Sequence, residues 1–119
     1  MIVADYGRTR SEDVSVRTYS EHADAGDPLR NLGGKDITID VDFEALQHRV
    51  RTADSLQSQE AWLLGHGIED LVAEGKSMWE QGVAAGSLDA IRGLSRAREV
   101  EALCDPLGLG GFFVAEWVI

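Results

Sequence analysis

The stretch DPLRNLGGKDITIDVDFEAL, from Asp27 to Leu46, combines more structural signals than any other part of the chain. Asp27-Pro28 and Gly33-Gly34 are turn-forming pairs, so they predict a loop in which the chain reverses its direction. After this loop, apolar residues alternate with polar ones as in a half-buried strand, and these apolar residues are Ile37, Ile39 and Val41. The stretch therefore predicts a loop followed by a strand.

A helix is predicted directly after this strand. The side chain of Asp42 can accept hydrogen bonds from the free amides of a first helical turn, which stabilises a helix by about 1 kcal/mol. Val41 and Leu46 can pack across the helix start as a hydrophobic staple. Phe43, Leu46 and Val50 are spaced to share one helix face. Asp42 thus has a structural explanation, whatever else it does.

Both ends of the chain predict apolar strands. Ile2-Val3-Ala4 leads into Asp5-Tyr6-Gly7, and residues 112–119 form a near-continuous apolar run. Ligands of open α/β sheets bind at the carboxyl ends of strands, which makes Asp5 and Tyr6 candidate site residues. The alternative is an Asp-x-Gly turn with no chemical role. A further strand is predicted near residues 14–19, and His22 follows it in a polar loop.

The middle of the chain has a helical pattern. Residues 55–58 are expected to break the preceding helix, with Ser58 capping the next one. Gly65-His66-Gly67 interrupts that helix, and Gly75 is expected to end the part that resumes after it. Further helical segments are expected at residues 78–85 and 88–103. The glycines at 108–111 follow a helix and precede a strand, so they form a connector, because a nucleotide-binding glycine loop follows a strand and opens a helix.

Composition narrows the function classes. With 119 residues the chain forms one domain at most, and its net charge of −10 argues against nucleic acid or an anionic membrane as the main partner. The single cysteine, Cys104, excludes an internal disulfide and a cysteine-rich zinc site, and a buried thiol is expected there. The histidines lack metal-ligand spacing, so no metal is expected. Without a signal peptide or a membrane-spanning run, a cytoplasmic location is expected.

Candidate chemistry is confined to one set of polar residues. No nucleophile elbow, P-loop or paired metal ligands occur in the sequence. Catalysis would then depend on side chains near the predicted strand ends: Asp5, Tyr6, His22, Asp36, Thr38 and Asp42. Spacing alone favours a hydrogen-bond network that orders loops over an active site.

The order of short motifs along the chain is more specific than their spacing. The motifs are Asp5-Tyr6-Gly7, His22, Asp27-Pro28-Leu29, Gly34, Asp36-Ile37-Thr38, Val41-Asp42-Phe43, Leu46, Gln59, Trp62-Leu63-Leu64, Gly67-Ile68, Asp105-Pro106, Leu109-Gly110 and Phe112-Phe113-Val114. In this order they resemble the C-terminal half of the MidA-type S-adenosyl-L-methionine (SAM)-dependent methyltransferases, the family of the mitochondrial complex I assembly arginine methyltransferase. Gly33 stands where that family usually has proline, and Trp62 where phenylalanine is common.

The resemblance implies an α/β fold that is the C-terminal part of a class I methyltransferase Rossmann-like sheet with an added helical segment. Residues 1–119 would be a single partial domain, in which residues 2–5 and 112–119 pair antiparallel. The family's glycine-rich loop after the first strand and its acidic residue after the second have no counterpart here. The resemblance therefore implies SAM as cofactor but assigns no cofactor-binding residue to this chain.

The resemblance also implies a function: the substrate-side portion of a SAM-dependent methyltransferase that acts on a protein arginine. Asp5 and Asp36 would orient the guanidinium and accept its proton, Tyr6 and His22 would align it, and Thr38 would belong to the substrate side. The expected partners are a protein substrate, the missing N-terminal half of the enzyme, and a second copy paired through the open edge of the first strand. The alternative is a non-catalytic acidic interaction module, or a fragment without activity of its own.

Overall fold

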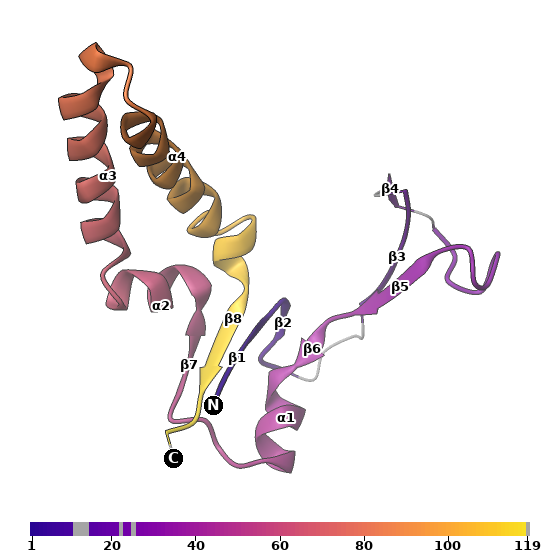
Figure 1. The fold of residues 1–119 in the computed structure, drawn as a ribbon. Helices are drawn as coiled ribbons and strands as arrows, with labels where there is room; N and C mark the ends of the chain where they lie inside the picture. Colours follow the sequence, from indigo (N-terminus) through magenta and orange to yellow (C-terminus); the bar gives the residue numbers. More distant parts are fainter. Residues whose placement is uncertain (11–14, 22, 25, 119) are drawn as a thin grey trace. The chain divides into compact units, whose positions relative to one another are not determined.

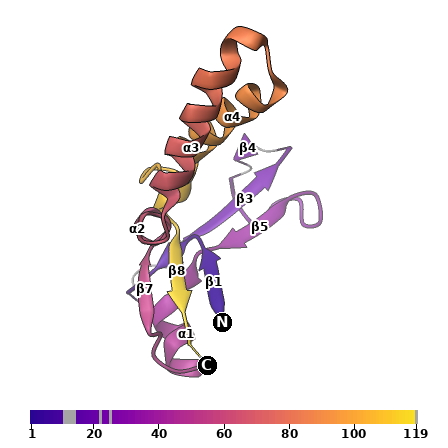
Figure 2. The ribbon, with the colours of Figure 1, turned by 60° about the vertical axis from the view of Figure 1, so that its left-hand side comes forward.

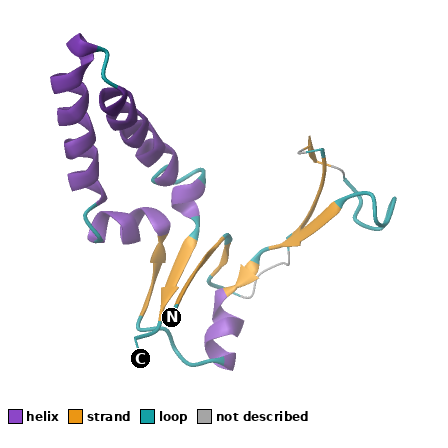
Figure 3. Ribbon diagram, in the orientation of Figure 1, coloured by secondary structure: helices purple, strands orange, loops and turns teal. Residues whose placement is uncertain are grey.

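A computed structural model of the chain describes residues 1–10, 15–21, 23–24 and 26–118. Its contacts divide the chain into two compact units, one made of Met1–Asp5 with Ala53–Ile119 and the other of Tyr6–Thr52. The described residues combine α-helices with mostly antiparallel strands, which is consistent with the predicted α/β class (Figures 1 and 3). The one parallel pair in the described part joins two-residue strands, so a Rossmann-like sheet stays a prediction.

The first unit contains a three-stranded antiparallel sheet. Strand β8 (Phe113–Glu116) lies between β1 (Ile2–Asp5) and β7 (Ser55–Ser58) (Figure 2). Ile2 pairs with Glu116 and Asp5 with Phe113, so the antiparallel pairing of the terminal strands is confirmed. Val114, Ala115 and Trp117 are buried in and just after the central strand, because it has a neighbour on each side.

Strand β7 was not predicted, because residues 55–58 were expected only to break a helix. Its Ser-Leu-Gln-Ser sequence has little strand propensity of its own. Pairing with β8 decides its conformation, and hydrogen bonds at both ends extend the pairing. The Asp54 amide donates to the Glu116 carbonyl at 2.8 Å, and the Gln59 amide donates to the Phe112 carbonyl at 2.7 Å. The prediction was wrong because the partner strand is more than fifty residues away in sequence.

Helix α2 (Gln59–Gly65) follows β7 directly. The hydroxyl of Ser58 accepts a hydrogen bond from the Ala61 amide at 3.2 Å, which confirms the predicted cap. The predicted interruption at residues 65–67 is also confirmed: Gly67 has a positive φ of 81° and precedes the next helix. None of the described helices is long and apolar enough to cross a membrane.

Helices α3 (Ile68–Gly82) and α4 (Leu88–Leu103) form an antiparallel hairpin (Figures 1 and 2). The expected helix end at Gly75 is wrong, because Gly75 is buried in the middle of α3. A Cβ atom on Gly75 would lie 2.7 Å from the Gly93 carbonyl oxygen of α4. Gly75 therefore allows α3 and α4 to pack closely and does not end a helix. The segment predicted at 78–85 is the end of α3 and a single 3₁₀ turn, η1 (Val83–Ala85).

The rest of the first unit is a connector. A 3₁₀ turn, η2 (Leu109–Gly111), joins α4 to β8. Gly110 is buried, and a Cβ atom there would lie 2.5 Å from the carbonyl carbon of Cys104. This confirms that the glycines at 108–111 connect a helix to a strand.

The second unit is built from short strands and one helix. Strand β3 (Val16–Ser20) pairs antiparallel with β4 (Ala23–Asp24) and with β5 (Asp36–Ile39), so the predicted reversal between two strands is confirmed. Strands β2 (Gly7–Arg8) and β6 (Val41–Asp42) pair parallel. Val14 and His22 lie outside the described residues.

Helix α1 (Phe43–Arg49) begins where the sequence predicts it. The carboxylate of Asp42 accepts a hydrogen bond from the Ala45 amide at 2.8 Å, so the predicted cap is confirmed. Phe43 is fully buried, whereas Val50 is 53% exposed. Val50 therefore does not continue the buried face as predicted, because the helix ends one residue before it.

Candidate functional site

The candidate site lies on one face of the β3–β5 pair. Arg17 faces Thr38 and Tyr19 faces Asp36 across the two strands. Residues opposite each other in a pair share a face, and so do residues two apart along a strand. The four side chains therefore lie on one side of the pair, which we call the polar face: Arg17, Tyr19, Asp36 and Thr38.

The opposite side of the same two strands is apolar. Val16 faces Ile39, and Thr18 faces Ile37. Thr18 is almost fully buried, and its hydroxyl donates a hydrogen bond to the Gly26 carbonyl at 2.6 Å. The alternation of apolar and polar residues in both strands thus fixes which side chains belong to the polar face.

The most specific arrangement on the polar face is a guanidinium held by a carboxylate and an aromatic ring. An Nη atom of Arg17 lies 3.0 Å from one carboxylate oxygen of Asp40 and 3.3 Å from the other. Its guanidinium carbon also lies 5.8 Å from the centre of the Tyr6 ring, within the range of a cation–π contact. Asp40 is largely shielded, with 15% of its side chain exposed, whereas Arg17 is half exposed.

Backbone contacts hold Tyr6 in this place. Its carbonyl accepts a hydrogen bond from the Val41 amide at 3.1 Å, beside the β2–β6 pair. The next residue, Gly7, has no room for a side chain, because a Cβ atom would collide with the Val41 carbonyl and lie 2.7 Å from the Phe43 ring. The Asp-Tyr-Gly sequence is thus explained in part by close packing that only glycine permits.

Three of the predicted site residues come together with Arg17. Tyr6 is in contact with its guanidinium, and Asp36 and Thr38 share its face. Asp5 belongs to the other unit, where it is the last residue of β1 and lies opposite Phe113. His22 lies outside the described residues. The catalytic roles of these five residues remain predictions.

Two important residues of the site, Arg17 and Asp40, were not among the predicted ones. Their ion pair joins positions 23 residues apart. The available signal was the strand alternation around Arg17, which places a cation on the polar side of β3. Its partner could not be identified because the register between β3 and β5 is set by the loop between them.

An open, polar depression lies at the loop end of the polar face. Its volume is about 410 Å³, and its lining residues are Tyr19, Ser20, Glu21, Gly33, Gly34, Lys35 and Asp36. Asp27 orders the neighbouring loop: its carboxylate accepts from the Leu29 amide at 2.9 Å, and its carbonyl accepts from the Lys35 ammonium at 2.7 Å. Asp27 therefore has a structural role in shaping this end of the site.

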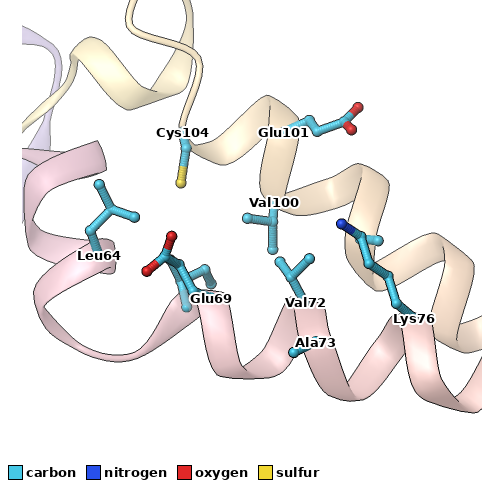
Figure 4. A pocket seen from close by; sticks show the side chains of 10 residues that line it. Leu64, Glu69, Val72, Ala73, Lys76, Val100, Glu101 and Cys104 are labelled. Carbon is cyan, nitrogen blue, oxygen red and sulfur yellow. The ribbon is translucent and has the colours of Figure 1, made fainter.

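Cys104 lies elsewhere, in a cleft beside α3 and α4 (Figure 4). The thiol is partly exposed and not fully buried as expected. Burial raises its pKa above the ordinary value, and the negative charge of Glu60 raises the pKa further. Because only the thiolate is a strong nucleophile, this environment does not activate Cys104.

A protein-family model described as "Putative S-adenosyl-L-methionine-dependent methyltransferase" matches residues 1–61, which is just over half of the 119 residues. The chain belongs to this family. The matched part of the chain includes the polar face, whereas α3 and α4 lie beyond it. Comparisons with curated proteins and with solved structures found no match.

Family membership implies SAM as the cofactor, but the described residues do not fit the way a class I methyltransferase binds it. Such a site needs a glycine-rich loop between a strand and a helix. In the described part of the chain, β6 leads directly into α1 and β7 directly into α2, without an intervening loop. Gly33 and Gly34 lie between strands, and the glycines at 108–111 follow a helix. No step of a mechanism can therefore be assigned to SAM on these residues.

Proposed function

We propose that this methyltransferase chain is of the MidA type and forms the substrate-side part of an enzyme that modifies a protein arginine. The observation that supports this proposal is the guanidinium of Arg17, which lies between the carboxylate of Asp40 and the ring of Tyr6. A surface that accommodates one guanidinium has the chemistry to accommodate another.

The polar face offers the groups that an arginine acceptor needs. A planar guanidinium is oriented by a carboxylate and an aromatic ring together. To become nucleophilic, one of its nitrogens must lose a proton to a positioned base. In this proposal Asp36 orients the acceptor and takes up the proton, and Tyr6 and Thr38 align it. The roles that the family resemblance implies for Asp5, which belongs to the other unit, and for His22, which lies outside the described residues, stay predictions.

The substrate would replace the side chain of Arg17. Arg17 is half exposed, and its ion pair with Asp40 is of the partly solvated kind that contributes at most about 1 kcal/mol. An incoming guanidinium could therefore displace it at little cost, while Asp40 and Tyr6 keep their places. When no substrate is bound, the guanidinium of Arg17 would keep the Asp40 carboxylate and the Tyr6 ring in place.

We further propose that the cofactor-binding residues come from an N-terminal half that these 119 residues do not include, and that the enzyme is cytoplasmic. The absence of a fitting strand–loop–helix junction in the described residues supports the first part. On this proposal the isolated chain binds a protein substrate but has no activity of its own.

A peptide titration tests the proposed substrate class. We expect an arginine-containing peptide to shift the amide resonances of β3 and β5 of the ¹⁵N-labelled chain, and a matched lysine peptide to shift them much less. Arg17→Leu should tighten arginine-peptide binding up to about fivefold, because it removes the competing cation. Asp40→Asn, Asp36→Asn and Tyr6→Leu should weaken it.

Arg10→Leu is the matched control, since it removes an exposed arginine outside the polar face and should leave the affinity unchanged. Equal binding of the lysine peptide, or weaker arginine binding by Arg17→Leu with intact folding, would overturn the proposed acceptor.

A second candidate function is a non-catalytic interaction module. The observation that favours it is the α3–α4 hairpin, which lies beyond the family match and has apolar clefts on its surface. A chain that binds neither arginine peptides nor a methyl donor but does bind another protein through this hairpin would support it.

A further inference from the structure

The hairpin of α3 and α4 leaves an apolar groove open along one side. The two helices approach each other through Gly75 and Gly93, so larger side chains diverge beside this close contact. The resulting groove has a volume of about 500 Å³, and its apolar floor consists of Leu64, Ile68, Val72, Ala73, Ala97 and Val100. We call this surface the hairpin groove (Figure 4).

The charges that α3 contributes to the groove are arranged symmetrically. Glu69 and Lys76 line it at its two ends, and both are exposed. They lie seven residues apart, on the same face as Val72 and Ala73, because residues three and four apart in a helix are neighbours. Glu69 and Lys76 are equally distant from the midpoint between Val72 and Ala73, and their charges are opposite.

This pattern is complementary to itself. If a second α3 packs antiparallel across the groove, with a two-fold axis between Val72 and Ala73, each Glu69 lies opposite Lys76 of the other copy. The apolar pair then meets its own counterpart at the axis, where the small Ala73 allows close approach. Glu101 of α4 also lines the groove. A uniformly acidic partner helix would therefore face two carboxylates, and a uniformly basic one would place a like charge against Lys76.

From this complementarity we infer that a second copy of this chain occupies the hairpin groove. Contact about a two-fold axis uses the same surface on both copies, as in most homodimers. Two helical hairpins packed in this way form a four-helix arrangement that covers the apolar stripes of α3 and α4. The inference is independent of the methyltransferase proposal and does not use the open edge of β1.

Charge reversal with rescue tests the inference on the full chain. Sedimentation velocity and light scattering should show a concentration-dependent dimer of the 13.0 kDa chain. Glu69→Lys alone and Lys76→Glu alone each place like charges together at both ends of the interface, so each should weaken dimerisation about tenfold. The double variant, Glu69→Lys with Lys76→Glu, exchanges the charges of α3 while Glu101 stays acidic. It should therefore bind clearly more tightly than either single variant.

Asp70→Lys and Arg98→Glu are matched controls. They change the net charge by the same amounts but alter exposed residues of α3 and α4 outside the groove lining, so they should leave the dimer intact. A monomeric wild-type chain, an unchanged dimer in both single variants, or a double variant that does not recover would overturn the inference.

Disulfide trapping provides a second readout that does not depend on charge. In a Cys104→Ser background, Ala73→Cys should form a disulfide between two copies under mild oxidation, because the two positions meet beside the axis. Ser77→Cys, on the same helix but outside the groove lining, should not. Equal cross-linking of the two variants would also overturn the proposed axis.

Discussion

Asp42 combines two structural contacts in one carboxylate. It accepts the Ala45 amide at 2.8 Å, and it lies 3.6 Å from the guanidinium of Arg8. It therefore joins the start of α1 to the neighbouring strand β2. At this scale most of the acidic residues between Asp27 and Leu46 have structural roles, since Asp27 orders a loop and Asp40 pairs with Arg17. Asp36 remains the carboxylate with a candidate chemical role.

Two substitutions separate the capping role of Asp42 from its charge. Asp42→Ala should lower the free energy of unfolding by about 1 kcal/mol, because the first turn of α1 loses its acceptor. Asp42→Asn keeps the acceptor and should lower it by only a few tenths of that amount, as expected for a partly exposed ion pair. Urea denaturation followed by circular dichroism measures both values. Equal losses would show that the contact with Arg8 dominates.

At the scale of elements, glycines act as packing residues more often than as helix ends. Gly75 and Gly93 are both buried at the contact of α3 with α4. Because glycine has no side chain, the two helices can approach closely at these positions. In sequence these glycines are indistinguishable from Gly67 and Gly86, which do lie at helix boundaries with positive φ. The contact across the hairpin distinguishes the two kinds.

Gly93→Ala tests this packing role. The added Cβ atom would collide with the Gly75 carbonyl oxygen and lie 3.1 Å from the Cβ atom of Met78, so the helices must separate. We expect a loss of about 1 to 3 kcal/mol in the free energy of unfolding. Gly65→Ala is the control, because nothing lies within 4 Å of its added Cβ atom and alanine favours a helix. A similar effect of both substitutions in thermal denaturation would contradict the packing role.

For the whole molecule, family membership implies SAM as the cofactor, whereas the described residues lack a site that fits it. Residues 1–61 match a SAM-dependent methyltransferase family. The described strand–helix junctions nevertheless lack the glycine-rich loop with which class I enzymes bind SAM. The two facts agree if the chain supplies substrate-side residues to a larger enzyme, as proposed above.

Calorimetry on the full chain tests this point directly. Titration with SAM should give no binding heat, because no described loop offers its backbone amides to the cofactor in the required setting. A family member that contains the glycine-rich loop should bind SAM under the same conditions and is the positive control. Stoichiometric binding by the 119-residue chain would show that its cofactor site lies on residues that we have not assigned.

Features that depend on neighbours along the chain could be predicted from the sequence. These are the caps at Asp42 and Ser58, the break at Gly67, the strand alternation of β3 and β5, and the family to which residues 1–61 belong. Local hydrogen bonds and periodicity carry this information, because each involves residues only a few positions apart.

Features that depend on partners far away in sequence could be identified only in the folded chain. Strand β7 forms because β8 pairs with it, and Gly75 lies inside a helix that packs against Gly93. Arg17 forms an ion pair with Asp40 because of a strand register that no local signal specifies. The stretch from Asp27 to Leu46 shows both kinds of information. Its loop, strand and helix could be predicted, whereas the guanidinium site beside it required the paired strands.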